Sequence, residues 1–397
     1  MSRSRTSETP RLSAVMREDE RVTALELFFD LVFVLALTQC TTLIVHTPTW
    51  GGVLKGLLVL GMLWWSWVGY AWLTSVVDPE EGTVRLVIFV AMAAFLVAAI
   101  CVPRAFGSDA LLFACAYAVV RAAHIVLFTL ASREDAALRS SVRGLAVSTA
   151  IGAGLLFVAA ATSGSVRVAI WGVALLLDAG GPFVFGQDGW KLVPGHFAER
   201  HGAVLIIALG ESVVALGVGA QEAIGVGVVL AAVLGISAAA TLWWIYFDVT
   251  AIVARRRLAK ASEGRERNGI ARDSYSYLHF PMIAGIALLA VGLKVVLAHV
   301  DRSLALVPAV ALLGGAALYL LAHVAFRLRN MHTLSVRRLL CAAALLALVP
   351  LHASVSALAL LGILTGLLVA LIVYEAVRYA DARDRIRHDL AREPVGD

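Results

Sequence analysis

Charge is scarce in this sequence, and long polar stretches are missing from it. Only 15% of the 397 residues are charged and 60% are hydrophobic, whereas soluble domains carry about 25% charged residues. A large aqueous domain is therefore excluded. The composition predicts an all-α polytopic integral membrane protein, because a chain that crosses a bilayer as separate apolar segments must satisfy its backbone hydrogen bonds within helices.

Motifs of common enzymes and metal proteins are also absent. There is no G-x-x-x-x-G-K-[ST] loop, which argues against a pump that uses ATP on its own. H-E-x-x-H, G-x-S-x-G and C-x-x-C are missing, and the ten histidines have no metal-ligand spacing. We therefore expect no metal, no cofactor and no disulfide framework. A hydrolase that used Ser212 would need His and Asp partners that the sequence cannot place beside it.

Twelve apolar segments are long enough to cross a bilayer, which takes about 20 residues per helix. They lie near 26–45, 53–76, 84–102, 110–131, 143–163, 166–185, 202–219, 224–251, 276–299, 304–327, 336–351 and 355–378. A break rich in Gly, Pro and charge separates the sixth from the seventh. We therefore expect an N-terminal tail over 1–24, a six-helix unit over 25–185, a linker over 186–201, a second six-helix unit over 202–379 and a C-terminal tail over 380–397.

The distribution of basic residues provides a test of this count. If the N-terminus is cytoplasmic, the tails and loops on that side carry 27 of the 33 Lys and Arg residues, and the opposite loops carry 4. This is the bias of the positive-inside rule, so we expect both termini in the cytoplasm. The basic segment 255–272 then serves mainly as an orientation signal, with anionic membrane lipids as secondary contacts. We expect no nucleic-acid partner.

The two halves of the sequence resemble each other. Trp64, in a Leu-Trp-Trp triplet, follows Asp30 by 34 residues, and Trp243, in the second such triplet, follows Glu211 by 32. Repeats of six spans each would be parallel, as in several transporter families. We interpret the pattern as a duplication, with chance similarity of apolar helices as the alternative. We interpret the many aromatic residues of the second and eighth spans as packing groups rather than as a ligand cage.

Several ionisable residues lie inside the expected spans, where such residues are costly and often functional. Glu26 and Asp30 are four residues apart and share one helix face. One interpretation is a cytoplasm-facing cavity lined by acidic residues of four spans, Asp30, Asp178, Glu211 and Asp248. The alternative is buried ion pairs, for example between Asp178 and Arg121. We expect Asp30 and Glu211 one to two turns inside the cytoplasmic face, and we favour function for both because they occupy matching places in the two halves. We expect Lys294 to reach the outer interface.

Two motifs resemble the signatures of a known family. The first is Glu26-Leu27-Phe28-Phe29-Asp30-Leu31-Val32-Phe33-Val34, and the second runs from His196-Phe197-Ala198-Glu199-Arg200-His201-Gly202 to Leu209-Gly210-Glu211-Ser212-Val213-Val214-Ala215. With both motifs in this order, the chain resembles the bacterial low temperature requirement protein A family over roughly residues 20–380. The resemblance implies a multi-pass protein of the bacterial cytoplasmic (inner) membrane, linked by name to growth in the cold. It implies no catalytic residue.

These features support three hypotheses of different kinds. The leading one is a secondary transporter or ion-conducting protein in which Asp30 and Glu211 bind protons or small cations. The second is a membrane-embedded enzyme acting on lipids, with Glu211 as acid–base carboxylate and Arg200 on a phosphate. The third is a non-catalytic scaffold linked to stress. All three are compatible with an oligomer. The candidate binding residues are Glu26, Asp30, Arg121, Asp178, Glu199, Arg200, Glu211, Ser212 and Asp248.

Overall fold

The computed structural model describes residues 21–186, 189–219 and 225–380, and within these ranges every regular element is a helix. Twelve helices or continuous helical stretches of this part of the chain are long and apolar enough to cross a membrane. The all-α fold and the count of twelve spans are therefore confirmed.

Two sets of six long helices follow each other along the chain. The first set is α1 (Ala24–His46), α2 (Trp50–Thr74), α3 (Gly82–Cys101), α4 (Ala110–Ala131), α5 (Ala136–Ala160) and α6 (Gly164–Val184). The second set is α7 (Pro194–Gly219), α8 (Val226–Phe247), α11 (His279–Ala298), α12 (Leu306–Met331), α13 (Val336–Ala347) and α14 (Ala357–Arg378). Between α8 and α11 lie α9 (Thr250–Lys260), α10 (Arg265–Ile270) and a π-helix over Ala271–Tyr277. Short 3₁₀ turns follow α3 and α13, over Val102–Arg104 and Val349–Ala353.

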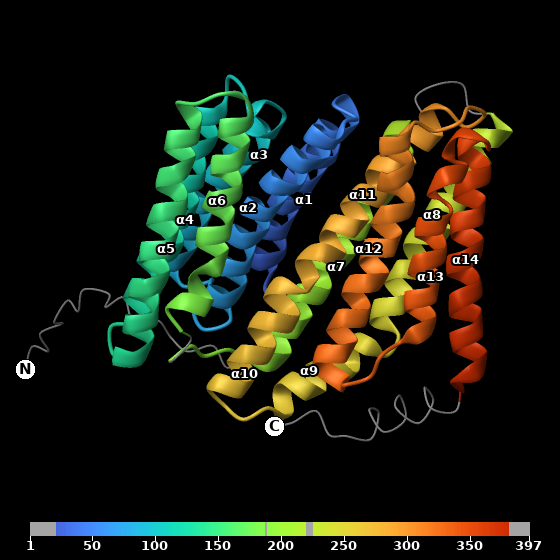
Figure 1. Cartoon of the computed structure of the whole chain (residues 1–397). Coiled ribbons are helices and arrows are strands. Elements are labelled where there is room, and N and C mark those ends of the chain that lie inside the picture. Colours follow the sequence, from blue (N-terminus) through green and yellow to red (C-terminus); the bar gives the residue numbers. More distant parts are fainter. Residues whose placement is uncertain (1–20, 187–188, 220–224, 381–397) are drawn as a thin grey trace, which may run out of the picture.

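The two sets lie side by side, and α1, α7 and α11 meet at the junction between them (Figure 1). Helix α1 contacts α2 and α3 of its own set, and it contacts α7 and α11 across the junction. The short helices α9 and α10 lie at one end of the bundle, where α1 begins and α14 ends (Figure 1). We call this the α9 end.

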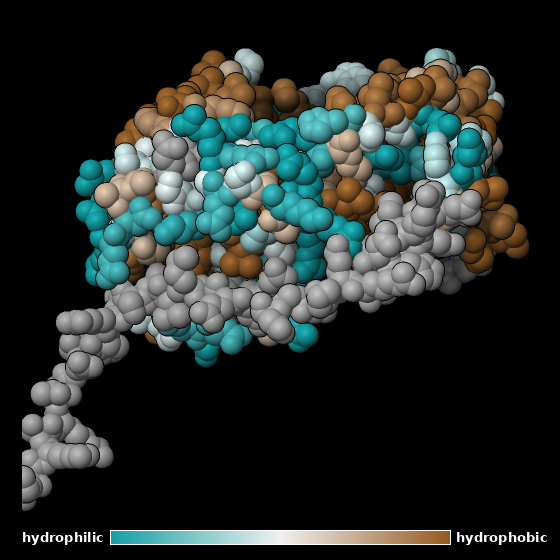
Figure 2. Space-filling view, turned by 90° about the horizontal axis from the view of Figure 1, so that it is seen from below, coloured by the Kyte–Doolittle hydropathy of each residue, from teal (hydrophilic) through white to brown (hydrophobic). Residues whose placement is uncertain are grey.

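Large apolar side chains cover the sides of the bundle. Leu176, Val226 and Val377 are 73%, 78% and 76% exposed. Hydrophilic residues gather instead on the α9 end, with hydrophobic residues along the upper and right edges of the view (Figure 2). A soluble protein rarely exposes contiguous apolar surface on this scale, so the sides of the bundle are the surfaces that contact lipid.

The start of the seventh helix differs from the prediction. Helix α7 begins at Pro194, inside the expected linker over 186–201, and proline suits the first turn because its missing N–H would have no helical partner there. Glu211 therefore lies 17 residues after the first residue of α7, about 26 Å along a helix that rises 1.5 Å per residue. Glu211 thus lies farther from the start of its helix than the expected span over 202–219 implied.

Helices α11 and α12 pack backbone against backbone. A Cβ atom added to Gly285 would lie 2.6 Å from the carbonyl oxygen of Gly315, and one added to Gly292 would lie 2.5 Å from Cβ of Leu312. Small residues permit such close approach between helices in a membrane, where van der Waals packing drives association. The two helices therefore form one tightly packed pair beside the junction.

Gly285→Ala is expected to lower the melting temperature of the purified protein, because the added methyl group would overlap the α12 backbone at a cost of about 1–3 kcal/mol. The matched control is Gly366→Ala on α14, where no atom lies within 4 Å of the added Cβ and alanine favours the helix. Thermal unfolding in detergent measures both. An equal effect of the two substitutions would contradict the importance of the α11–α12 contact.

Candidate functional site

Helices α1 and α7 run in the same direction and contact each other along their length. Three polar pairs across this contact are each separated by 170 positions: Glu26 with His196, Asp30 with Arg200, and Thr41 with Glu211. A constant difference is the pattern of two parallel helices in fixed register. The junction between the two sets is therefore held by complementary polar groups at several levels.

The first charged group at the junction, which we call the Asp30 cluster, consists of Glu26, Asp30, Trp67, His196 and Arg200. Arg200 places one guanidinium nitrogen 3.0 Å from Asp30 Oδ1 and another 3.2 Å from Glu26 Oε1. Trp67 of α2 donates to Asp30 Oδ1 at 2.7 Å, and His196 Nε2 lies 2.9 Å from Glu26 Oε1. All five side chains are buried, so water screens their interactions little.

Glu26 also caps the helix that carries the cluster. Its Oε2 accepts hydrogen bonds from the backbone N–H of Thr23 at 2.8 Å and from the Thr23 hydroxyl at 3.0 Å, and that hydroxyl accepts from the Glu26 N–H. This capping box satisfies backbone donors at the start of α1. The same carboxylate is thereby oriented toward His196 and Arg200 through its other oxygen.

One oxygen of the Asp30 cluster is still available. Among the described residues, Asp30 Oδ2 is buried and has no hydrogen-bond partner. Buried polar atoms are rarely left in this state, and an exception needs a physical reason. A very small pocket adjoins the cluster, and its lining includes Glu26, Phe29, Tyr70 and Arg200. An incoming proton or a water molecule is what such an oxygen could bind.

The second charged group, which we call the Glu211 cluster, lies farther along the same two helices. Lys294 of α11 places Nζ 2.8 Å from Glu211 Oε1 and 2.7 Å from the Thr41 hydroxyl. The Thr41 hydroxyl lies 2.7 Å from Glu211 Oε1, and the Thr38 hydroxyl donates to Oε2. Lys294 is only 9% exposed, so the expectation that it reaches the interface was wrong, because a carboxylate partner lies inside the protein.

Arg121 and Asp178 form a third buried pair, within the first set of helices. The Arg121 guanidinium lies 2.7 Å from Asp178 Oδ1, and the Tyr117 hydroxyl donates to Asp178 Oδ2 at 2.7 Å. Thr149 of α5 accepts from Arg121 at 2.6 Å. The pair joins α4, α5 and α6, which is the ion-pair arrangement that the sequence offered as the alternative to a shared cavity.

The remaining candidate residues lie outside these groups. Glu199 is exposed on α7, whereas Ser212 is buried and its hydroxyl has no hydrogen-bond partner among the described residues. Asp248, at the end of α8, lines a separate pocket near Arg338. The four acidic residues of the expected cavity therefore occupy separate places. Asp30 and Thr41, the α1 residue that contacts Glu211, are about 16 Å apart along the helix.

Sequence reasoning missed Thr38, Thr41 and Lys294 as partners of Glu211. A helical projection carried part of the signal, because Thr41 follows Asp30 by 11 residues and shares its face of α1. Lys294 was recognised as a base inside a span, but its partner depends on the true start of α7. Trp67 gave no sequence signal that separates it from the neighbouring tryptophans.

Asp30 and Arg200 are expected to show strong coupling in a double-mutant cycle with Asp30→Asn and Arg200→Gln. Removing one partner leaves the other charge buried, and hydrogen bonds to charged groups contribute about 1.5–3 kcal/mol. The matched control is the pair Arg104–Asp109, whose side chains are 64% and 19% exposed and whose coupling we expect below about 1 kcal/mol. Free energies of unfolding in mixed micelles measure both. Equal coupling would argue against a desolvated pair at the junction.

The chain is similar to a known protein family and to an uncharacterized bacterial protein. A family model described as "Bacterial low temperature requirement A protein (LtrA)" matches residues 21–373. An uncharacterized protein of Rhizobium meliloti (strain 1021), RA0937, is 31% identical over 309 residues, which are 74% of this chain and 74% of the relative. No solved structure matches. Both charged clusters lie within the residues that the family model matches.

Proposed function

The chain belongs to the bacterial low temperature requirement A family, and we propose that it functions as a secondary transporter coupled to protons. The observation that carries the proposal is the pair of buried charged clusters on the α1–α7 contact. Each cluster sets a carboxylate, Asp30 or Glu211, against a basic side chain of a neighbouring helix. Ionisable groups inside a membrane protein are rare and mark proton and ion pathways.

The geometry favours protons over metal cations as the coupling ion. Asp30 and Glu211 each face a fixed positive charge, at 3.0 Å and 2.8 Å respectively, so a cation would have to displace Arg200 or Lys294. Hard cations also prefer several oxygen ligands, and the described residues contain no group of three or more His, Cys, Asp or Glu able to hold a metal ion. A proton needs only one carboxylate oxygen.

Protonation would weaken the contact between the two sets of helices. A neutral Asp30 would no longer attract Arg200 as an ion, and Arg200 would be left with Glu26. A neutral Glu211 would release Lys294 of its own set, and it would bind the Thr38 and Thr41 hydroxyls of α1 across the junction less strongly. The two clusters lie at different depths of one helix pair, so one contact can open while the other is closed. Alternating opening at two depths is what a transporter of two rocking halves requires.

A parallel duplication of the two sets is part of this proposal, and their matching neighbours support it. Helix α1 contacts α2 and α3, as α7 contacts α8 and α11, and α2 contacts α6 as α8 contacts α14. Transporters with internal repeats place their sites where the repeats meet, and both clusters lie there. The tryptophan triplets add less support, because Trp64 and Trp65 are buried whereas Trp243 and Trp244 are 43% and 38% exposed.

The lipid-enzyme alternative receives less support from the site. Arg200 and Glu211 are 11 residues apart on α7, about 16 Å along the helix, so they do not face one substrate bond. Arg200 is also fully buried and engaged by two carboxylates. The scaffold alternative predicts that both carboxylates tolerate replacement by amides.

The test is proton movement into liposomes that contain the purified protein and a pH-sensitive dye. With gradients of K⁺, Na⁺ or Cl⁻ imposed in turn, we expect flux from the wild type. Asp30→Asn and Glu211→Gln are expected to reduce it to the level of empty liposomes, because an amide cannot exchange the proton. Asp109→Asn, which removes an exposed ion pair, should leave the flux unchanged.

Folding is controlled separately from flux. The double variant Glu211→Gln/Lys294→Gln removes both charges of the pair and so avoids a stranded buried cation. It should unfold at a temperature closer to the wild type than Glu211→Gln alone, and it should still lack flux. Undiminished flux in both single variants, or no flux from folded wild-type protein under any gradient, would overturn the proposal.

A further inference from the structure

A cavity of about 580 Å³ lies at the α9 end of the second set of helices, on the side away from the first set (Figure 1). The ends of α8, α12 and α14 and the start of α13 form its wall. Sites for small ligands typically measure about 300–1,000 Å³. This cavity, which we call the α13 cavity, therefore has room for a lipid headgroup or for a soluble anion of similar size.

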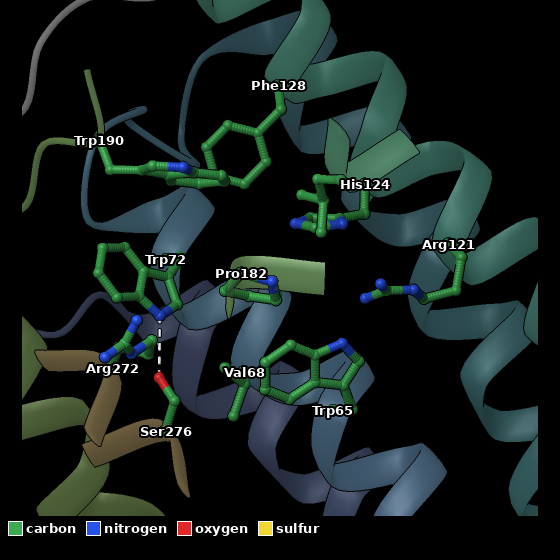
Figure 3. Close-up of a pocket in the computed structure, with 12 residues that line it drawn as sticks. Trp65, Val68, Trp72, Arg121, His124, Phe128, Pro182, Trp190, Arg272 and Ser276 are labelled. Atoms are coloured by element: carbon green, nitrogen blue, oxygen red, sulfur yellow. Dashed lines mark hydrogen bonds between the residues drawn. The ribbon is translucent and has the colours of Figure 1, made fainter. Parts of the chain in front are cut away.

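The aromatic cavity beside α2 and α4 is of a different kind. Trp72, Phe128 and Trp190 meet edge to face in its wall, with Trp190 5.6 Å from Trp72 and 4.8 Å from Phe128 (Figure 3). Its space is about 50 Å³, which holds only a few water molecules. These aromatic side chains therefore pack against one another and leave no room for an organic ligand.

Three arginines and two carboxylates line the α13 cavity, and one arginine is paired within it. The lining charges are Arg327, Arg337, Arg338, Asp248 and Glu375. Arg338 donates to both oxygens of Glu375, at 3.0 Å and 2.7 Å, and lies 2.7 Å from a ring nitrogen of His323. Glu375 is therefore already engaged, and the formal charge of the lining is positive.

Arg327 and Arg337 are the two arginines of the α13 cavity that have charge to offer. Within the part of the chain that the structure describes, neither forms an ion pair with a carboxylate, and Arg327 Nε is buried without a hydrogen-bond partner. Arg337 lies over the rings of Tyr374 and Tyr379, at 4.9 Å and 5.4 Å, and donates to the Tyr379 hydroxyl. These neutral partners do not compensate its charge. Two such guanidinium groups are suited to the oxygens of a phosphate, which they can bind through paired hydrogen bonds.

The start of α13 adds neutral donors to the same cavity. His332 ends α12 with a φ of 54°, and the chain turns there so that Thr333 to Arg338 line the cavity. The Ser335 side chain makes no capping hydrogen bond. The first N–H groups of a helix have no helical partner and favour a negative charge. The donors of α13 therefore support the arginines in attracting an anion.

The rim of the α13 cavity is apolar. Trp244, Leu334 and Val336 line it and are 38%, 55% and 55% exposed. Tryptophan is typical of the membrane–water interface, and this cavity lies where the lipid-facing sides meet the hydrophilic α9 end. Basic cavities between membrane helices at this level are typical binding places of anionic lipid headgroups.

We propose that the α13 cavity binds a phosphate-bearing anion, and that the source of the phosphate is the headgroup of an anionic phospholipid. Arg327 and Arg337 hold the phosphate oxygens through charge-assisted hydrogen bonds. The acyl chains leave the cavity over Leu334 and Val336 and lie along the apolar side of the bundle. A soluble phosphate ester would make the contacts to the arginines but not those to the rim.

The experiment is native mass spectrometry of the full-length protein released from detergent micelles. The three probes are phosphatidylglycerol, phosphatidylcholine with the same acyl chains, and glycerol 1-phosphate, which lacks acyl chains. We expect phosphatidylglycerol to bind about tenfold more tightly than either of the others, because choline adds a positive charge beside the arginines and glycerol 1-phosphate gains nothing from the rim. Equal affinity for the two lipids would overturn the proposal. Glycerol 1-phosphate binding as tightly as phosphatidylglycerol would overturn the lipid source.

Two substitutions place the lipid in the α13 cavity. Arg327→Gln and Arg337→Gln should each weaken phosphatidylglycerol binding about fivefold and leave phosphatidylcholine binding unchanged. Neither removes a partner of a buried carboxylate, so the unfolding temperature should stay close to that of the wild type. The matched control is Arg143→Gln, an exposed arginine near the start of α5 at the same end of the bundle, which should have no effect.

The outcome is independent of the transport proposal, because lipid binding is measured without any gradient. If both arginine variants bind phosphatidylglycerol as the wild type and Arg143→Gln do, the proposed site is wrong. A proton flux that fails while this lipid binding holds would overturn only the transport proposal.

Discussion

A charge in the interior of a membrane protein must be paired, and this constraint governs how α1, α7 and α11 pack. Desolvation of an ion costs several kcal/mol, and only a partner in good geometry offsets it. Asp30 and Arg200 therefore cannot be separated without leaving a buried charge unpaired, and the same holds for Glu211 and Lys294. The apolar residues of the same helices are interchangeable by comparison, because lipid and protein interior are similar environments for them.

The constraint also explains why the paired residues come from helices far apart in the sequence. A carboxylate and a base on one helix would neutralise each other locally and hold nothing together. Here the base of each pair is supplied by another helix, Arg200 from α7 for Asp30 and Lys294 from α11 for Glu211. Breaking either pair would therefore remove a contact between two helices.

The sequence predicts the membrane-spanning helices, but it does not predict which charged residues of different helices pair. Twelve apolar runs of bilayer length specify twelve spans, and Asp30 and Glu211 stood out because acids are rare there. Their surroundings depended on the start of α7, which lies in a stretch of Gly, Pro and charge that also fits a loop. Reading that stretch as a linker placed Arg200 outside the spans, whereas it lies inside α7 against Asp30. Such pairs depend on how neighbouring helices are aligned with each other, and the periodicity within one helix does not reveal that alignment.

The glycine contact between α11 and α12 has a mechanical consequence. With Gly285 against Gly315 and Gly292 against Leu312, the two helix backbones are too close to slide past each other without steric overlap. The two helices are therefore expected to move together as one rigid unit. Lys294 lies on this rigid unit and Glu211 lies on α7. A tilt of the α11–α12 unit relative to α7 would therefore change the Lys294–Glu211 distance.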